Sequence, residues 1–314
     1  MSIHGKFLLS PHANFRWQAF VNASTAEKQY RNTLSAAGCN DINCLRSLSE
    51  SDLVSVQQVV MNNSYQQPPY VDGDYYFGPS VDGVFIREHP NTAYKNGRFY
   101  KVPFLVDHNE WEGVAFSRQI NSSQQIIPDE ESFFTGRGPS FFGKLFNFYP
   151  ASAYNSSFWQ RVDWFSDVVV DCTPSYLCKL TSGPTYFMAK AQTDHSYNSS
   201  AVWKMRFDAG SEIHGATSAF IYSIDLTRPG ANNQTLADIM TWYWISFAIW
   251  NDPNVLKLAE APYWPSYIEG GQNGTCGFST LAVTYTTVSP EPDEQNSPKC
   301  DFFNAEGYLS FGGD

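Results

Sequence analysis

The sequence predicts an α/β protein built on a parallel sheet, and three observations lead to this class. Short apolar runs of strand length occur at 6–10, 101–107 and 184–190. Longer stretches with helical spacing of apolar residues separate these runs. Aromatic residues make up 16% of the 314 residues and charged residues also 16%, as expected for a globular chain that can bury a large core.

The three runs have the length and the flanking residues of buried strands. They read Lys6-Phe-Leu-Leu-Ser10 before Pro11, Lys101-Val-Pro-Phe-Leu-Val-Asp107, and Pro184-Thr-Tyr-Phe-Met-Ala-Lys190. Continuous apolar runs, rather than alternating ones, are typical of strands that are covered on both faces. Three strands are few for a sheet of this class.

Helices are expected between and after these strands. The residues 17–36 suit a helix that ends at Gly38, and the residues 45–61 suit a second one. The clearest helix spans Thr235 to Trp250, begins with a capping-box pattern at Thr235 and Asp238, and ends before Pro253. The aromatic-rich residues 114–180 are expected to form helices and loops. Because the chain has no repeat or linker, we expect one domain over residues 1–314.

The charge and the cysteine spacing exclude several kinds of partner. The net charge is −11 and the pI is near 4.9, so nucleic acid and anionic membranes are poor partners. The sequence has no stretch long enough to span a membrane. It has no C-x-x-C motif, and no histidine lies near a cysteine pair, so we expect neither a metal nor a cofactor.

Cysteines and glycosylation motifs indicate an oxidising compartment. The six cysteines fit three disulfides, although sequence alone leaves about 15 pairings open. Acceptor sequons N-x-S/T occur at Asn22, Asn62, Asn121, Asn155, Asn198, Asn233 and Asn273. We therefore expect a secreted glycoprotein. Since Met1-Ser-Ile-His-Gly-Lys6 lacks the pattern of a signal peptide, we expect the natural start and its signal peptide to lie upstream.

Two loops carry candidate catalytic residues. Glu112 follows the second expected strand and precedes Gly113, and His214 lies in a loop with Gly215 beyond the third expected strand. In α/β proteins, functional groups sit on loops just beyond the carboxyl ends of strands. A carboxylate that precedes and orients a histidine base is the second half of a hydrolase triad. Taken singly, Glu112 also fits a solvated loop carboxylate, and His214 a structural or surface histidine.

The chain resembles the type-B carboxylesterase/lipase family, which includes cholinesterases and secreted fungal lipases. The resemblance rests on landmarks that occur in the order of the family and span nearly the whole chain. They are Gly38-Cys39 with Cys44-Leu-Arg46, Phe77-Gly-Pro-Ser-Val-Asp-Gly83, Val102-Pro-Phe-Leu-Val106 with Asn109-x-x-Glu112-Gly113, His214-Gly215, Phe247-Ala248 with Asp252-Pro253-Asn254, Trp264-Pro-Ser-Tyr267, and Lys299-Cys300-Asp-Phe-Phe303.

This resemblance implies an α/β-hydrolase fold that cleaves carboxylic esters through an acyl-enzyme. Glu112 would orient His214, which would act first as general base and then as general acid. We expect cysteines that are neighbours in sequence to pair, as Cys39–Cys44, Cys172–Cys178 and Cys276–Cys300. The first and last of these pairs have precedent in the family. The aromatic-rich residues 132–164 are expected to line an apolar pocket for a small ester.

The chain departs from the family in lacking a nucleophile. No G-x-S-x-G motif occurs, and the nearest sequences, around Ser80 and Ser140, lack the second glycine and lie in the wrong order. The glycine-rich oxyanion loop is also missing. We therefore expect the C-terminal half of an α/β-hydrolase sheet, with residues 7–10 forming the strand after the nucleophile, and no activity in this chain alone.

Two other functions are compatible with parts of the sequence. One is a non-catalytic interaction protein on the α/β-hydrolase fold, which would have no need of both Glu112 and His214. The other is an unrelated secreted binding module, which would make the ordered landmarks a coincidence. The resemblance and the retained pair favour the ester hydrolase.

Overall fold

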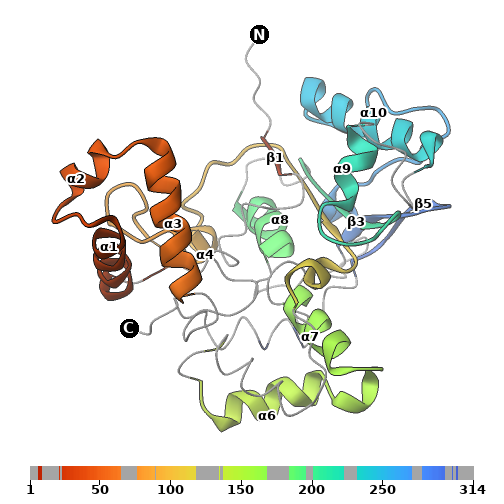
Figure 1. The fold of residues 1–314 in the computed structure, drawn as a ribbon. Helices are drawn as coiled ribbons and strands as arrows, with labels where there is room; N and C mark the ends of the chain where they lie inside the picture. Colours follow the sequence, from red (N-terminus) through yellow and green to blue (C-terminus); the bar gives the residue numbers. More distant parts are fainter. Residues whose placement is uncertain are drawn as a thin grey trace.

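A five-stranded mixed sheet organises the described part of the protein (Figure 1). The computed structural model describes residues 6–8, 21, 23–64, 76–88, 90–117, 134, 137–167, 184–195, 201–222, 232–270, 278–293, 299 and 302. The strands lie side by side in chain order and are β1 (Lys6–Leu8), β2 (Phe104–Asn109), β3 (Val202–Asp208), β4 (Ser279–Thr284) and β5 (Val288–Pro292).

The first four strands are parallel, and β5 pairs with β4 in antiparallel orientation. In the register, Phe7 lies beside Leu105, Leu105 beside Trp203, and Phe207 beside Val283. The carboxyl ends of β1 to β4 therefore lie at one edge of the sheet. This arrangement confirms the predicted α/β class.

Two of the three predicted strands are confirmed and the third is wrong. β1 and β2 lie within or overlap the runs 6–10 and 101–107, but the run 184–190 begins the helix α8 (Pro184–His195). A short apolar run cannot be distinguished from a buried helix by periodicity alone. Here Pro184 is well suited to the first turn of a helix, and Ala189 and Ala191 are strong helix formers.

The strand that follows β2 in the sheet is β3, which was not predicted because it is not a continuous apolar run. Its apolar residues Trp203, Met205 and Phe207 alternate with Lys204 and Arg206, as in a strand with one solvated face. Lys204 is nevertheless fully buried. The strand lies between β2 and β4 and is covered on both faces, so its basic residues need partners within the protein.

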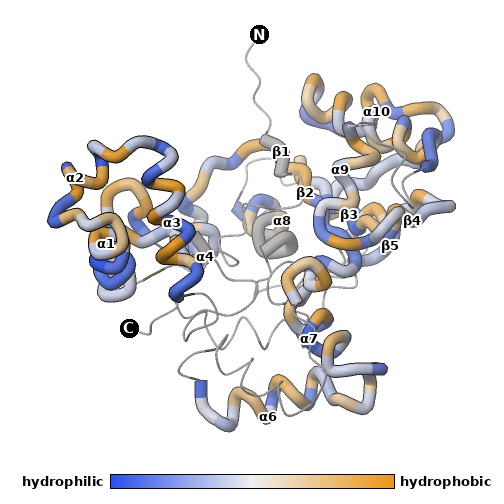
Figure 2. The backbone as a smooth tube through the Cα atoms, in the orientation of Figure 1, coloured by the Kyte–Doolittle hydropathy of each residue, from blue (hydrophilic) through white to orange (hydrophobic). Residues whose placement is uncertain are grey.

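One face of the sheet packs against α9 (Ala216–Ile221) and α10 (Gln234–Trp250). Hydrophobic residues predominate along α10 (Figure 2). The core on this face contains Trp203, Met205 and Phe207 from β3 together with helix residues such as Phe220, Met240, Tyr243 and Phe247. Burial of such apolar area is the main force that holds a helix to a sheet.

The predicted helix at 235–250 is confirmed, but its cap is different. Asn233 is the N-cap residue and accepts a hydrogen bond from the backbone N–H of Leu236, whereas Thr235 and Asp238 lie inside the helix. At the other end Asn251 is the C-cap in the left-handed conformation, with φ of 56°. Asparagine tolerates this conformation better than most residues.

The opposite face of the sheet packs against α8 and the 3₁₀ helix η4 (Tyr267–Gly270). Its smaller core joins Phe104, Val106 and Val202 of the sheet to Ala189 and Tyr267. The short helix α4 (Pro90–Lys95) lies beside α8. The sheet is therefore covered on both sides, as the continuous apolar sequence of β2 predicts.

Three helices form a unit apart from the sheet (Figure 1), and they are α1 (Ala23–Ala37), α2 (Ile42–Ser47) and α3 (Glu50–Ser64). The first confirms the predicted helix at 17–36 within the described residues. The predicted single helix at 45–61 is instead α2 and α3, because the backbone of Leu48 is extended. Leu53 and Val59, two apolar residues of α3, are exposed by 44% and 47%.

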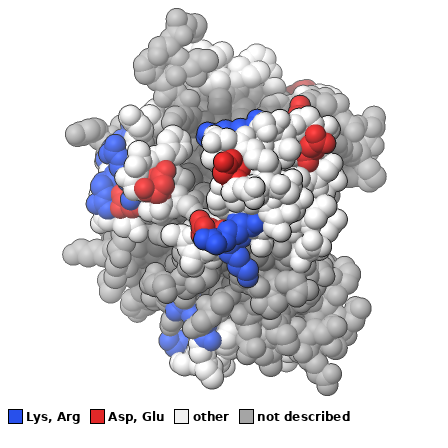
Figure 3. All heavy atoms as spheres, turned by 60° about the vertical axis from the view of Figure 1, so that its left-hand side comes forward, with Lys and Arg blue, Asp and Glu red and all other residues white. Residues whose placement is uncertain are grey.

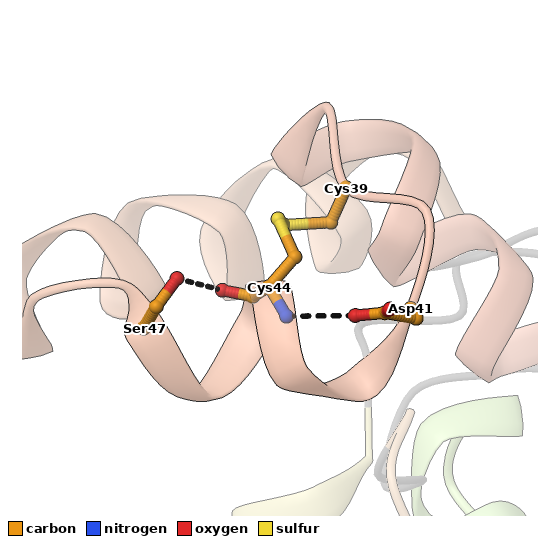
Figure 4. Close-up of a disulfide and its surroundings, with 4 residues drawn as sticks. All are labelled: Cys39, Asp41, Cys44 and Ser47. Atoms are coloured by element: carbon orange, nitrogen blue, oxygen red, sulfur yellow. Dashed lines mark hydrogen bonds between the residues drawn. A yellow bond between two sulfur atoms is a disulfide. The ribbon is translucent and has the colours of Figure 1, made fainter.

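The disulfide Cys39–Cys44 closes the turn between α1 and α2 (Figure 4). Its Cα atoms are 5.5 Å apart, and Asp41 caps α2 by accepting a hydrogen bond of 2.8 Å from the N–H of Cys44. This pair confirms the prediction for the first two cysteines. Cys172, Cys178, Cys276 and Cys300 lie outside the described residues.

An aromatic subdomain lies beside the loops after β2. It contains η1 (Glu112–Phe116), α6 (Pro139–Phe148), η2 (Ala151–Ala153) and α7 (Ser157–Ser166), so the described parts of 114–180 are helices and loops as predicted. Its core consists of Phe141, Phe142, Leu145, Tyr149, Trp164, Phe165 and Phe302.

The described surface carries charges of both signs. On the face shown in Figure 3, basic and acidic side chains of the described residues lie near one another, with no extended basic surface. One such exposed pair among the described residues is Arg98–Glu88, with Nε of Arg98 2.6 Å from Oε1 of Glu88. No helix among the described residues is long and apolar enough to cross a membrane.

The buried ion pair of Lys204 and Asp293 yields a prediction about stability. Nζ of Lys204 lies 3.0 and 2.8 Å from the two carboxylate oxygens of Asp293, and the Tyr267 hydroxyl donates to Asp293 at 2.7 Å. Asp293→Ala would leave a buried cation without this carboxylate. We expect it to lower the free energy of unfolding by about 3–5 kcal/mol in urea titrations.

A surface pair provides the control for this prediction. Glu27 and Arg31 form an exposed i, i+4 pair on α1 at 2.8 Å. Glu27→Ala should cost no more than about 0.5 kcal/mol. Equal losses for Asp293→Ala and Glu27→Ala would contradict a structural role for the buried pair.

Candidate active site

Glu112 lies in the loop that follows β2 and is the first residue of η1. Its side chain is only 1% exposed. Oε1 accepts hydrogen bonds from the backbone N–H of Asn109 at 2.7 Å and from Nδ2 of Asn109 at 2.9 Å. Glu112 is therefore not a solvated loop carboxylate, because protein donors replace water around it.

Gly113 fixes this loop against α7. Its N–H donates to Oγ of Ser166 at 2.8 Å. A Cβ atom at position 113 would lie 2.5 Å from the carbonyl oxygen of Val162 and 2.9 Å from Oγ of Ser166. Only glycine allows η1 to approach α7 this closely at position 113. The close contact fixes the backbone next to Glu112 and so the position from which its side chain extends.

His214 lies in the turn between β3 and α9. The turn contains three residues with positive φ, Gly210 at 71°, Glu212 at 59° and Gly215 at 83°. A parallel bridge between Trp111 and Ile213 joins it to the loop after β2, with the N–H of Trp111 2.9 Å from the carbonyl of Glu212. The two loops thus extend the pairing of β2 with β3 beyond the sheet.

The structure brings the two predicted residues together. Nδ1 of His214 contacts Oε2 of Glu112 within hydrogen-bonding distance. The side chain of His214 is 13% exposed, so a partly open imidazole lies against a buried carboxylate. The ring of Phe116 packs edge-to-face on the imidazole with centroids 4.9 Å apart. The contact is made by Nδ1, and Nε2 is the second ring nitrogen, at which a proton could be exchanged with another group.

Sequence reasoning named Asn109 only as part of a motif and did not single out Ser166, Phe116 or Thr217. The amide of Asn109 bonds to Glu112, and Oγ1 of Thr217 donates to Oδ1 of Asn109 at 2.9 Å. The spacing of Asn109 from Glu112 could have indicated this bond, because an Asn side chain often bonds to groups a few residues away. Ser166 and Thr217 are more than 50 residues from their partners, and no local pattern marks them.

Neither Ser80 nor Ser140, the serines of the two sequences that are nearest to G-x-S-x-G, has the surroundings of a nucleophile. Oγ of Ser80 donates to the carbonyl of Val21 at 2.8 Å, which ties a loop to a neighbouring segment. Ser140 is an exposed residue in the first turn of α6. Within the described ranges, no cluster of three or more His, Cys, Asp or Glu side chains could hold a metal ion.

An acidic cluster surrounds Arg206 beside the candidate site. The guanidinium group bonds to Glu110 at 3.2 Å, to Glu291 at 2.8 Å and to Asp208. Burial raises the pKa of Asp208 to about 7, and the carboxylates of Glu110 and Glu212 act in the same direction, whereas Arg206 lowers it. The end of β3 therefore holds a carboxyl group that titrates near neutral pH.

A parallel sheet with a carboxylate and a histidine on the loops after neighbouring strands is the arrangement expected of the α/β-hydrolase fold. The comparison with known families agrees with this class. The model of the Carboxylesterase family matches residues 2–285, and the chain belongs to this family. The predicted family and fold are thereby confirmed.

This chain is similar to parts of several larger proteins. "Secreted lipase 1" of Botryotinia fuckeliana is 24% identical over 264 residues, which are 77% of this chain and 43% of that protein. The "cAMP-regulated D2 protein" of Dictyostelium discoideum is 23% identical over 86% of this chain and 50% of its own length. The structure of Aspergillus niger EstA is similar in fold, with a TM-score of 0.75 and 18% identity over 96% of this chain and 58% of its own. This chain spans about half the length of the curated relatives it matches.

The close approach of Gly113 to α7 yields a prediction about the site. Gly113→Ala should lower the free energy of unfolding by about 1–3 kcal/mol, because the new methyl group must displace backbone atoms of α7. Gly143→Ala is the matched control, since Gly143 lies exposed in α6 with open space around it. That variant should gain about 0.5–1 kcal/mol. Equal effects in urea unfolding would refute the close-packing argument.

The raised pKa of Asp208 predicts a pH dependence of stability. The folded state keeps a proton that the unfolded state releases, so between about pH 4 and pH 7 the contribution of Asp208 falls as the pH rises. Asp208→Asn should therefore flatten the decline of stability over this range. Unfolding midpoints at several pH values measure this, with the exposed Glu260→Gln as control. An unchanged slope in Asp208→Asn would show that Asp208 does not hold the proton.

Proposed function

We propose that this chain is the C-terminal part of a secreted serine carboxylic-ester hydrolase, one incomplete domain in which Glu112 and His214 are two members of the catalytic triad. The observation that carries this proposal is the contact of the buried Glu112 carboxylate with Nδ1 of His214. The order of acid before histidine, each on a loop after a parallel strand, also supports it.

In this mechanism His214 moves the proton. Its Nε2 would take the proton of a serine hydroxyl as that oxygen attacks the ester carbonyl, and would then return the proton to the leaving alcohol. Glu112 would hold the Nδ1–H tautomer and stabilise the imidazolium that forms. Water would repeat the sequence on the acyl-enzyme and release the acid.

The nucleophile and the oxyanion donors would come from residues outside this sequence. The chain contains no G-x-S-x-G motif, and its relatives match over only 43% and 50% of their own lengths. A preceding half of the same domain would supply the serine on its strand-to-helix turn. We propose that it would pair with β1, the first strand of the described sheet.

A small apolar ester is the proposed substrate. Phe116 packs on His214, and the aromatic core of α6 and α7 lies next to it through the stacked rings of Phe116 and Phe165. Similarity to proteins named as lipases supports the same class. The disulfide Cys39–Cys44, the sequons and the relative named as a secreted lipase support secretion.

The absence of a nucleophile motif supports a second candidate function, a non-catalytic interaction protein of the same fold. In that case the Glu112–His214 pair would have no chemical role. The coding sequence directly upstream of Met1 distinguishes the two candidates. An in-frame G-x-S-x-G motif followed by about one helix would support the hydrolase.

The chain expressed alone should hydrolyse no p-nitrophenyl ester. Without the serine and its oxyanion hole, a Glu–His pair gives only weak general-base help. A fluorophosphonate probe, which labels activated serines, should leave the chain unmodified by mass spectrometry. Labelling of Ser80, Ser140 or another serine that depends on His214 would contradict the proposal and would require a different active site.

Co-expression with the upstream half should restore hydrolysis and probe labelling of the new serine. His214→Ala and Glu112→Gln should then each lower kcat by about 10³-fold or more. The exposed His195→Ala on α8 is the control and should retain activity. A restored complex in which His214→Ala remains fully active would refute the proposed triad.

A further inference from the structure

We propose that Asn109 and Thr217 are positioning residues that hold Glu112 and the His214 turn in one fixed arrangement. They lie next to the proposed catalytic pair and do not contact His214 in any bond described above. The inference rests on the proposed function only for its consequence in catalysis. The arrangement itself can be tested without any hydrolysis.

On one side, Asn109 fixes the Glu112 carboxylate. Its backbone N–H and its Nδ2 both donate to Oε1, at 2.7 and 2.9 Å. Two donors on one oxygen define the plane of the carboxylate and direct the other oxygen, Oε2, toward His214. Asn109 is fully buried at the end of β2, so no water can replace these bonds without rearrangement.

On the other side, Asn109 holds the start of α9. Its Oδ1 accepts from Oγ1 of Thr217 at 2.9 Å and from the backbone N–H of Thr217 at 3.3 Å. Because a backbone N–H can only donate, the oxygen of the amide must face Thr217 and its nitrogen must face Glu112. The amide therefore cannot flip without losing bonds on both sides.

The bonds close a ring across the two loops. His214 and Thr217 belong to the same turn, and Gly215, the N-cap of α9, offers no side chain to its first N–H groups. Asn109, the last residue of β2, supplies the side-chain oxygen that accepts from the N–H of Thr217 in the first turn of α9. The ring passes from His214 to Glu112, to Asn109, to Thr217 and back along the chain, so a shift of either loop strains the contact of the pair.

We call the hydrogen bonds of Asn109 to Glu112 and Thr217 the brace. Its loss has a defined chemical consequence. Without the side chain of Asn109 the Glu112 carboxylate can rotate, and the position of Oε2 relative to Nδ1 of His214 is no longer fixed. The imidazole then exchanges between its two tautomers, because the tautomer of a histidine is set by the bond that its other nitrogen makes. In a triad the wrong tautomer cannot accept the serine proton at Nε2.

The test measures the His214 tautomer by ¹⁵N NMR of the full chain with labelled histidine, at a pH where the ring is neutral. The wild type should show the Nδ1–H tautomer. Asn109→Ala and Thr217→Val should shift both ring nitrogens of His214 toward the average of the two tautomers. Thr217→Ser keeps the hydroxyl and the N–H and should retain the wild-type signals. Thr280→Val, at a buried threonine of β4, controls for the same change elsewhere.

Backbone amide spectra establish that each variant is folded, and Thr217→Val preserves the test if Asn109→Ala does not fold. Folded Asn109→Ala or Thr217→Val with the unaltered wild-type tautomer would overturn the proposal. In a complex with a restored nucleophile, Asn109→Ala should lower kcat by about 10- to 100-fold with little change in KM.

The two proposals can fail separately. If the restored complex hydrolyses no ester but the tautomer depends on Asn109, the proposed function fails and the brace remains. If hydrolysis requires His214 but Asn109→Ala changes neither the tautomer nor kcat, the brace fails and the proposed function remains.

Discussion

The parallel pairing of β2 with β3 is the constraint on which the site depends. In this register Asn109 lies beside Phe207, so both strands end at the same level of the sheet. The bridge of Trp111 with Ile213 continues the pairing past the strand ends and brings Glu112 to His214, although 102 positions separate the two residues in the chain. A shift of one residue would turn Glu112 toward another part of the molecule.

The two basic residues of β3, Lys204 and Arg206, are stabilised within the sheet by carboxylate partners. Lys204 projects into the face that holds Phe104, Val106 and Tyr267, and Asp293 at the end of β5 meets it there. Arg206, two residues further along β3, binds carboxylates that come from β5 and from the loop after β2. These pairs specify the positions of β3 and β5, because an uncompensated charge at such a depth would cost several kcal/mol.

The sequence predicted the parts of the protein whose causes are local. The apolar runs of β1 and β2, the long helix α10 and the disulfide Cys39–Cys44 follow from periodicity, from flanking residues and from the family landmarks. Strand β3 was missed because Lys204 and Arg206 interrupt its apolar residues, so it is not a continuous apolar run. Asp293 and Glu291, the partners of these two side chains, lie more than 80 residues later in the chain. Within the site, Glu112 could be predicted as a residue on the loop after a strand. His214 was expected after the run 184–190, which is helix α8, and it follows the unpredicted strand β3 instead. Thr217 and Ser166 could not be predicted, because their roles arise from contacts between distant segments.

The contacts that organise the Glu112–His214 pair all lie within this chain. Asn109 orients the carboxylate, Gly113 and Ser166 fix its loop, and Phe116 covers one edge of the imidazole. A buried carboxylate with donors on one oxygen and an imidazole on the other is costly to assemble, and a binding surface gains nothing from it. Under the proposed function, the pair is a preassembled acid–base unit. A nucleophile supplied from outside this sequence would then need only to place its hydroxyl group near Nε2 of His214, because the orientation of the ring is already determined.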